Sequence, residues 1–497
     1  MSQPTRAEWE ARAKALKIEG RAFIQGEYLA AASGETFDCI SPVDGRLLAK
    51  VASCDAADAE RAVQSARNTF DSGVWSREAP ATRKAVMIRF AALLEEHAEE
   101  LALLETLDMG KPIGDSLNVD LPGAADSLRW SGEAIDKVYD EVAATSHDQL
   151  GLVTREPVGV VAAIVPWNFP LMMAAWKLGP ALATGNSVIL KPSERSPLTA
   201  IRIAQLAIEA GIPAGVLNVL PGYGHTVGKA LALHMDVDTA VFTGSTKIAK
   251  QLMVYAGESN MKRVWLEAGG KSPNIVFEDA PDLQAAAESA AAAIAFNQGE
   301  VCTAGSRLLV QKSIKAKFLP LVVEALKGWK AGHPLDPETN VGALVDGRQL
   351  EQVLGYIQAG QDEGAKILAG GKRVLEETGG TYVEPTLFDG VSNAMKIARE
   401  EIFGPVLSVI EFEDAEEAIR IANDTPYGLA AAVWTRDISK AHLTARALRA
   451  GSVWVNMYDG GDMTAPFGGF KQSGNGRDKS LHAFDKYTEL KATWIKL

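Results

Sequence analysis

One cysteine stands among small residues in the middle of the chain. In FNQGEVCTAGSR, residues 296–307, Cys302 is followed by Thr303, Ala304 and Gly305, so little bulk surrounds its sulfur. A thiol with an ordinary pKa of about 8.5 becomes a useful nucleophile where a positive or hydrogen-bonding environment favours the thiolate and a substrate can reach it. Most free cysteines are instead small buried hydrophobic residues. The chemistry therefore depends on which polar groups accompany Cys302.

Two residues are suited to assist a cysteine nucleophile. Glu267 ends a predicted strand in VWLEAGGKSP, beside Gly269 and Gly270, where a carboxylate has room to move and act as a general base. Asn168, in PWNFP, carries an amide N–H of the type that stabilises an oxyanion. The seven histidines include no pair at metal-ligand spacing. This pattern predicts no metal site and weakens a Cys–His hydrolase.

One glycine-rich turn comes close to a dinucleotide-binding fingerprint. VLNVLPGYGHTVG has Gly222, Gly224 and Gly228 after a predicted strand, but Val227 stands where the third glycine of the fingerprint belongs. An ordinary loop with turn glycines explains the same residues. By itself this turn does not predict a cofactor site.

Two other strand ends are candidates for binding a nucleotide. VFTGSTKIAK places Gly244 and Ser245 at a helix start, where free N–H groups and the helix dipole favour a phosphate. SVILKPSE ends a strand with Lys191 and Glu194, and such ends are where open α/β sheets bind ligands. A carboxylate there can accept both hydroxyls of an adenosine ribose. A solvated loop pair is the alternative.

These residues depend on an alternation of strands and helices. From about 155 to 280, short β-rich runs alternate with helical stretches, which is typical of a parallel sheet covered by helices on both faces. We read 158–165 as a buried strand followed by a functional turn, because Pro166 and Pro170 would break a membrane-spanning helix. A second alternation follows Gly269 and Gly270. The pattern predicts an α/β fold with two such domains.

Composition excludes several classes of protein. The 497 residues are 47% hydrophobic and 23% charged, which is ordinary for a large globular protein. A net charge of −13 without a basic block argues against nucleic-acid binding. Three cysteines build no disulfide framework, and the N-terminus lacks the apolar run of a secretory signal. We therefore expect a cytoplasmic protein with no membrane association.

The motifs together resemble the aldehyde dehydrogenase superfamily, from about residue 23 to the C-terminus. The matching phrases are PWNFP (166–170), KPSE (191–194), FTGST (242–246), LEAGGKSP (266–273), NQGEVC (297–302), EEIFGP (400–405) and PFGGFKQSG (466–474). The resemblance implies that Cys302 is the nucleophile, that Glu267 is the base for deacylation, and that Asn168 forms the oxyanion hole with the Cys302 backbone N–H.

The resemblance also implies a nicotinamide cofactor and its contacts. The expected cofactor-binding residues are Trp167, Lys191, Glu194, Gly244, Ser245, Glu401 and Phe403. The cofactor lies against FTGST in this family, which would make GYGHTVG a decoy. NAD is favoured because Glu194 would repel the 2′-phosphate of NADP, although Lys191 partly offsets this and NADP stays possible.

The family's architecture implies specific domain bounds. Residues 1–136 and 157–267 are expected to form an NAD-binding domain, and 268–472 a catalytic domain, both Rossmann-like. Residues 137–156 and 473–497 are expected to form a small β oligomerisation element. A homodimer or homotetramer is then expected, and the edge-strand composition of the C-terminus agrees with it.

The substrate end of the site is similar to that of bacterial γ-glutamyl-γ-aminobutyraldehyde dehydrogenases and broad aminoaldehyde enzymes. Gly460 and Gly461 stand where many relatives have bulkier residues, which suggests a wide entrance. Aspartates could receive an amino or guanidino end, with cation–π help from aromatic side chains. Solvated loop residues are the alternative for each aspartate. The candidate substrate residues are Asp120, Phe169, Met173, Trp176, Tyr458, Asp459, Asp462 and Phe467.

Three functions stay open at this level. The first is NAD(P)-dependent oxidation of aldehydes to acids, with γ-glutamyl-γ-aminobutyraldehyde, 4-aminobutyraldehyde or 4-guanidinobutyraldehyde from polyamine or arginine breakdown as substrates, or broad aliphatic aldehydes instead. The second is a cofactor-independent thiol hydrolase using Cys302. The third is a non-catalytic protein that retains the fold, which the combination of Cys302, Glu267 and Asn168 argues against.

Overall fold

The first of two large sheets occupies the N-terminal half of the chain. The structure is a computed structural model that describes residues 4–497. This seven-stranded sheet has the order β11-β10-β7-β8-β9-β1-β2, and its five strands from β11 to β9 run parallel. Its strands are β1 (Ala22–Ile24), β2 (Glu27–Leu29), β7 (Val160–Ile164), β8 (Ser187–Lys191), β9 (Leu217–Val219), β10 (Thr239–Gly244) and β11 (Arg263–Ala268). The predicted parallel sheet is confirmed.

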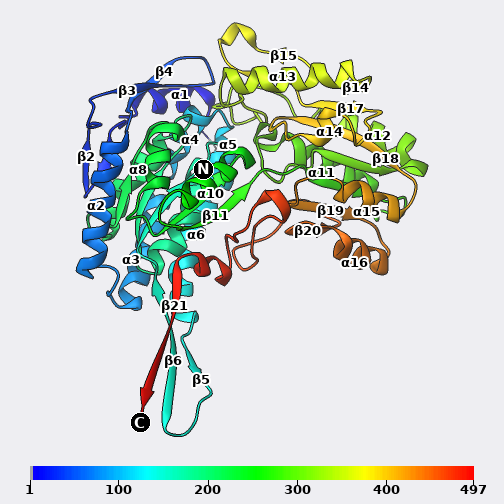
Figure 1. Ribbon diagram of the computed structural model, residues 1–497. Coiled ribbons are helices and arrows are strands. Elements are labelled where there is room, and N and C mark those ends of the chain that lie inside the picture. Colours follow the sequence, from blue (N-terminus) through cyan, green and yellow to red (C-terminus); the bar gives the residue numbers. More distant parts are fainter. Residues whose placement is uncertain (1–3) are drawn as a thin grey trace.

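Helices surround this sheet (Figure 1). They are α1 (Arg6–Ala15), α2 (Ala56–Ser72), α3 (Pro80–Glu96), α4 (Ala98–Met109), α5 (Ile113–Asp115), α6 (Leu121–Ala134), α7 (Pro170–Ala183), α8 (Leu198–Ala210), α9 (Lys229–Leu233) and α10 (Thr246–Gly257). Every residue of β7 and β8 is buried, as expected for strands covered on both faces. Proline at the first position of α7 and left-handed Gly211 after α8 mark the ends of these two helices.

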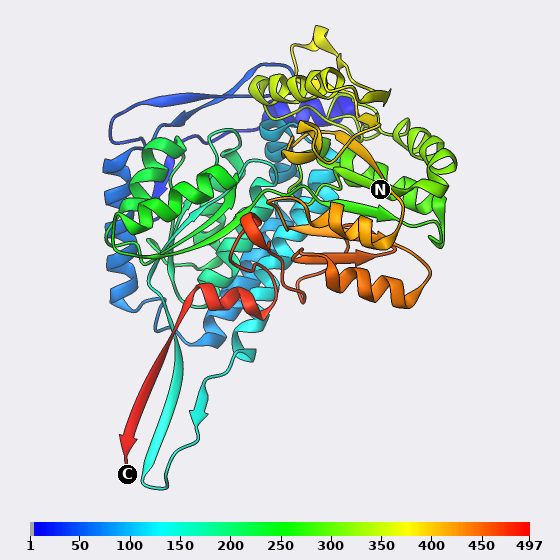
Figure 2. The same cartoon turned by 45° about the vertical axis from the view of Figure 1, so that its right-hand side comes forward.

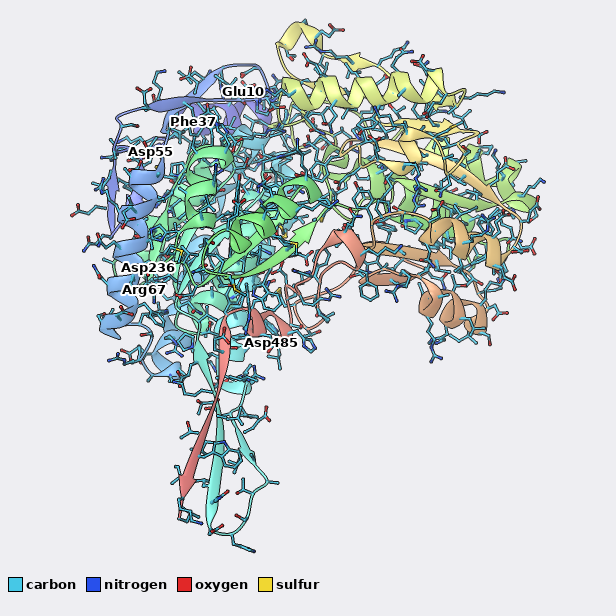
Figure 3. All side chains as sticks on the ribbon, viewed as in Figure 1. Glu10, Phe37, Asp55, Arg67, Asp236 and Asp485 are labelled. Atoms are coloured by element: carbon cyan, nitrogen blue, oxygen red, sulfur yellow. The ribbon has the colours of Figure 1, made fainter. Side chains whose placement is uncertain are left out.

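The contacts of α2 show how a helix is fixed to the sheet. Asp55 caps its first turn by accepting a hydrogen bond from Ala57 N (2.8 Å). Further along the helix, Arg67 donates to the carbonyl of Asp236 (3.1 Å), and both residues are labelled in Figure 3. Arg67 also forms an ion pair with Asp238. The helix thus covers the sheet in a fixed orientation.

A second seven-stranded sheet follows in the C-terminal half, with the order β14-β17-β18-β13-β12-β19-β20. All neighbours are parallel except β14 and β17. Its strands are β12 (Pro273–Val276), β13 (Arg307–Gln311), β14 (Lys366–Ala369), β17 (Thr386–Asp389), β18 (Val406–Phe412), β19 (Ala430–Trp434) and β20 (Ser452–Val455). Its helices are α11 (Leu283–Ala295), α12 (Lys312–Leu326), α13 (Gly347–Asp362), α14 (Lys396–Arg399), α15 (Ala415–Asn423) and α16 (Ile438–Ala447).

A three-stranded antiparallel sheet projects from the body as an arm (Figures 1 and 2). It has the order β21-β6-β5, from β5 (Glu141–Ala143), β6 (Gln149–Pro157) and β21 (Thr488–Lys496). The arm leaves Leu490 and Trp494 exposed. Two small hairpins complete the described strands: β3 (Thr36–Ile40) with β4 (Leu47–Ala52), and β15 (Arg373–Val374) with β16 (Tyr382–Val383).

Residues 4–497 lack two features that would bear on function. None of the helices there combines the length and the apolar character that crossing a membrane requires. In the same residues, no three His, Cys, Asp or Glu side chains are grouped so as to hold a metal ion.

Candidate active site

One cavity of about 650 Å³ collects the expected catalytic and cofactor residues. It opens where the parallel strands β7, β8, β10 and β11 end, the edge at which open α/β sheets bind ligands. The predicted residues that line it are Trp167, Asn168, Lys191, Glu194, Gly244, Ser245, Glu267, Cys302, Glu401 and Phe403. The structure therefore brings together residues spread over more than two hundred positions of the sequence.

Cys302 follows a loop with an unusual backbone. Asn297, Gln298 and Gly299 all have positive φ, at 48°, 56° and 70°. A side chain at Gly299 would meet the backbone of Gly404 at 2.4 Å, so only glycine fits there. Such strained conformations occur mainly at functional sites, where the surrounding structure holds them.

Two buried side chains hold this loop against residues 342–345. Gln298 Oε1 accepts a hydrogen bond from Gly342 N (2.9 Å), and Glu300 Oε1 accepts one from Val345 N (3.1 Å). Burial raises the pKa of Glu300 well above its ordinary value, whereas the hydrogen bond from Val345 N lowers it. These hydrogen bonds fix Gln298 and Glu300, and Cys302 follows Glu300 by two residues.

The Asn168 amide lies directly against the cysteine loop. Its Nδ2 donates to the carbonyl of Glu300 (2.8 Å), while Asn297 Nδ2 donates to the carbonyl of Asn168 (3.1 Å). Asn168 is only 4% exposed. A side-chain amide has two N–H groups, and one bond to Glu300 leaves the second available for an oxyanion in the cavity.

Glu267 is a buried carboxyl group with unused hydrogen-bonding capacity. It is 4% exposed, and its Oε1 has no hydrogen-bond partner among the described residues. Burial raises its pKa well above the ordinary value, and the charge of Asp478 raises it further. Asp478 is itself held between Lys177 (2.5 Å) and Lys486. A carboxyl group with a raised pKa that lines a cavity is suited to proton transfer near neutral pH.

The electrostatic setting of Cys302 is acidic rather than positive. Burial raises the pKa of its thiol, and the carboxylates of Asp459, Glu267 and Glu401 raise it further. The Thr303 backbone N–H acts in the opposite direction, and so does the charge of Lys479. The cysteine therefore rests as a neutral thiol at neutral pH, and its attack on a substrate requires removal of a proton.

The expected cofactor residues form one wall of the cavity. Lys191 Nζ lies 3.3 Å from Glu194 Oε2, at the end of β8. Ser245 caps α10 by accepting from Ile248 N (3.4 Å), and Gly244, Ser245 and Ile248 at the start of this helix line the cavity. Glu401 Oε1 accepts from Gly270 N (3.0 Å). Hydroxyl-binding carboxylates and a helix N-terminus match the chemistry of a nicotinamide dinucleotide, so the residues fit this cofactor.

The turn GYGHTVG was interpreted as a decoy, and the structure corrects this interpretation. Gly224, His225 and Gly228 line the same cavity as Gly244 and Ser245. The turn forms a short π-helical segment after β9 that leads directly into α9, and α9 packs against α10. This segment stands where the fingerprint would have its usual strand-to-helix turn.

The expected substrate residues divide into two groups. Met173, Trp176 and Phe467 line the cavity, and the rings of Trp176 and Phe467 meet edge to face at 5.1 Å. Next to the nucleophile, Tyr458 donates to the carbonyl of Thr303 (2.5 Å), and Asp459 accepts from the Thr303 hydroxyl (3.3 Å). These five residues surround the Cys302 end of the site.

The other three lie elsewhere. Asp120 is 1% exposed and forms a buried ion pair with Lys111 (2.5 Å). Phe169 packs beneath the same lysine, whose Nζ is 4.1 Å from the ring centre. Asp462 is exposed and accepts hydrogen bonds from Thr464, as a turn residue does. The structure therefore does not place Asp120 or Asp462 in the cavity, which corrects that expectation.

Sequence reasoning missed two residues at the site. Gln349 on α13 donates to the carbonyl of Phe403 (2.7 Å) and lines the cavity. Lys479 lies over the ring of Trp176, with its Nζ 4.7 Å from the ring centre. No local pattern identifies either, because both reach the site through tertiary packing.

Comparisons with known proteins agree with this geometry. Residues 28–493 match the model of the aldehyde dehydrogenase family. The chain is 58% identical to the NADP/NAD-dependent aldehyde dehydrogenase PuuC of Escherichia coli, over 99% of this chain and 98% of that one. A P. syringae indole-3-acetaldehyde dehydrogenase mutant in complex with NAD⁺ and IAA is 84% identical, with a TM-score of 0.99 and full coverage of both chains. A γ-glutamyl-γ-aminobutyraldehyde dehydrogenase from Burkholderia cenocepacia is 64% identical, with a TM-score of 0.98, over 99% of this chain and 100% of that one.

Proposed function

The chain belongs to the aldehyde dehydrogenase family, and on that premise we propose that Cys302, Glu267 and Asn168 oxidise aldehydes bearing an amino group. The enzyme is an NAD(P)-dependent aldehyde dehydrogenase. One observation supports these residue roles above all. Cys302 and Glu267 line the same cavity as the residues expected to bind the dinucleotide. A cofactor-independent hydrolase or a scaffold would have no use for that wall.

Cys302 is proposed to attack the aldehyde carbon. Its thiol gives its proton to water, the sulfur forms a C–S bond to the aldehyde carbon, and the carbonyl oxygen becomes an oxyanion that accepts hydrogen bonds from Asn168 Nδ2 and the Cys302 backbone N–H. NAD(P), when bound, accepts the hydride that leaves the substrate carbon. The product at this stage is an acyl thioester on Cys302.

Glu267 is proposed to release the acid. Its carboxylate takes a proton from water, the resulting hydroxide attacks the thioester carbonyl, and the C–S bond breaks to regenerate the Cys302 thiol. Asn168 stabilises the second oxyanion as it did the first. The buried carboxyl group has the unpartnered oxygen that this role requires.

Asn168→Ala should lower kcat by about 100- to 1,000-fold, because one donor to the oxyanion is lost. The rate of Cys302 alkylation by iodoacetamide should change little, since the thiol and its surroundings stay in place. Steady-state kinetics by absorbance at 340 nm, with alkylation as the control for folding, test this. A kcat within about tenfold of the wild type would remove Asn168 from the mechanism.

Glu194 is proposed to decide between the two cofactors. Its carboxylate would repel a 2′-phosphate, whereas Lys191, 3.3 Å away, offsets part of that charge. Glu194→Gln removes the charge at nearly constant size and should raise kcat/KM for NADP by about tenfold relative to NAD. Measuring both cofactors with one aldehyde tests this. An unchanged ratio would show that another group sets the preference.

Aminoaldehydes are proposed as substrates on two grounds. The Asp459 carboxylate lies next to the nucleophile, through its contact with Thr303, and the aromatic rings of Trp176 and Phe467 line the cavity. Carboxylates and aromatic faces both favour a cationic amino group. One similar solved structure supports this choice, the γ-glutamyl-γ-aminobutyraldehyde dehydrogenase from Burkholderia cenocepacia.

A second candidate substrate is indole-3-acetaldehyde. The edge-to-face pair of Trp176 and Phe467 favours a flat aromatic group, since such rings pack well against one another. An enzyme for this aldehyde is among the similar solved structures.

The test is a comparison of aldehydes by cofactor reduction at 340 nm. The aldehydes are γ-glutamyl-γ-aminobutyraldehyde, 4-aminobutyraldehyde, 4-guanidinobutyraldehyde, indole-3-acetaldehyde and propanal. Higher kcat/KM for the aminated aldehydes than for propanal would support the proposal. Equal or better rates with propanal would overturn the choice of substrate, and a preference for indole-3-acetaldehyde would favour the second candidate.

The domain assignment and the assembly are also proposals. Sheet contacts support an NAD-binding domain from 1–136 and 157–267, and a catalytic domain from 268–472. The projecting arm, with exposed Leu490 and Trp494, supports an oligomerisation role for 137–156 and 473–497. A homodimer or homotetramer would cover these side chains. A cytoplasmic location remains part of the same proposal.

A further inference from the structure

Lys479 is a partly buried cation at the substrate end of the site. Its Nζ lies 4.7 Å from the ring centre of Trp176, a residue that lines the cavity. Its neighbour in sequence, Asp478, also lines the cavity. Among residues 4–497, no carboxylate lies within the 4.0 Å of Lys479 that defines an ion pair. Lys479 is therefore a positive charge beside the cavity wall, packed on Trp176 and without an ion-pair partner among the described residues.

The backbone that carries Lys479 is strained. Lys479 and Ser480 have φ angles of 57° and 51°, in the left-handed region that non-glycine residues seldom adopt. The Phe467 and Asp478 backbones exchange two hydrogen bonds just before it (2.8 and 2.7 Å). These contacts direct the lysine side chain over Trp176 instead of outward, although a lysine gains most by reaching water.

An opposite charge lies near Lys479. The carboxylate of Asp459 accepts from the Thr303 hydroxyl at 3.3 Å, one residue from Cys302. Burial lowers the pKa of Lys479, and Asp459, Asp462 and Asp478 act in the opposite direction. Of these acids, Asp478 is already paired with Lys177 and Lys486. The substrate end thus presents one unpaired ammonium group together with one carboxylate beside the nucleophile.

We propose that Lys479 binds a carboxylate at the far end of the substrate aldehyde, beside Trp176. This inference rests on the proposed function, because it specifies the far end of the aldehyde. A γ-glutamyl group carries such a carboxylate, whereas 4-aminobutyraldehyde has only an ammonium group.

Two variants separate recognition from packing. Lys479→Met keeps the length of the side chain and its contact with Trp176 but removes the charge, and Lys479→Arg keeps the charge. The four test aldehydes are γ-glutamyl-γ-aminobutyraldehyde with both charges, succinic semialdehyde with a carboxylate, 4-aminobutyraldehyde with an ammonium group, and propanal with neither. Initial rates are measured at saturating NAD, and a thermal melt checks folding.

Lys479→Met should lower kcat/KM for the two carboxylate-bearing aldehydes by about 10- to 100-fold, mainly through KM. The other two aldehydes should be nearly unaffected, and Lys479→Arg should retain most of the wild-type activity. Equal losses on all four aldehydes, or no loss on the carboxylate-bearing pair, would overturn the inference.

Failure of the proposed function would look different. If the wild type oxidises propanal as well as 4-aminobutyraldehyde, the preference for an amino group is wrong. Carboxylate binding by Lys479 is tested separately, by how much Lys479→Met lowers kcat/KM for succinic semialdehyde compared with propanal.

Discussion

Cys302→Ala is expected to abolish oxidation of every aldehyde, with a fall in kcat of at least about 10⁴-fold. The reason is that alanine has no atom able to form the covalent bond through which the reaction proceeds. Absorbance at 340 nm measures the loss, and binding of NAD by calorimetry should persist, because the cofactor wall is formed by other residues. This is the largest effect the account predicts.

Cys54→Ala is the matched control. Cys54 is fully buried in the apolar core around β1 and β7, and burial raises the pKa of its thiol, so it is expected to be inert. This variant should keep kcat near that of the wild type. Appreciable NADH formation by Cys302→Ala, or a comparable loss in Cys54→Ala, would show that the thiol at 302 is not the reacting group.

Glu267→Gln is expected to stop the reaction after one turnover. The aldehyde is oxidised and one NADH per active site is released, but the thioester then hydrolyses about 100- to 10,000-fold more slowly, because the general base is missing. Stopped-flow absorbance should show a burst of NADH followed by a very slow steady rate. Ping-pong chemistry through an acyl-enzyme has this kinetic form.

The pH profile provides a second readout for Glu267. Burial and Asp478 raise its pKa, so in the wild type the carboxyl group is protonated at low pH and becomes a competent base only as the pH rises. Steady-state kcat should therefore increase with pH in the wild type. Glu267→Gln should lose this increase. A variant with the wild-type profile and no burst would assign deacylation to another group, and Glu401 is a candidate because it also lines the cavity.

Much of this fold was predictable because its strands are buried on both faces. The runs 160–164 and 187–191 are mainly apolar and fully buried, and a proline follows each of them where the strand ends. Residues placed at those ends meet at one edge of the sheet by topology alone. For that reason the sequence predicts that Asn168, Lys191 and Glu267 lie together.

The substrate end was less predictable, for a physical reason. A carboxylate such as Asp120 has the same appearance in sequence whether it faces a ligand or a buried lysine, and here Lys111 pairs with it. Asp462 accepts a hydrogen bond from Thr464 N within its own loop. Lys479 lies over Trp176 with its backbone in a left-handed conformation. No local sequence pattern predicts this conformation.

The acidic setting of Cys302 was also not foreseen. Sequence reasoning expects a positive or hydrogen-bonding environment around a reactive thiol. Instead, Asp459, Glu267 and Glu401 converge on it from three separate segments and raise its pKa. These three acids are far from Cys302 in the sequence, so the residues around the cysteine do not predict them.

The most direct test of the account is mass spectrometry of Glu267→Gln quenched with acid after mixing with NAD and γ-glutamyl-γ-aminobutyraldehyde. We predict that the peptide containing Cys302 gains the mass of the acyl group, and that the moles of modified peptide equal the moles of NADH released in the burst. NADH formation without an adduct on that peptide would contradict a thioester on Cys302, and with it the central claim.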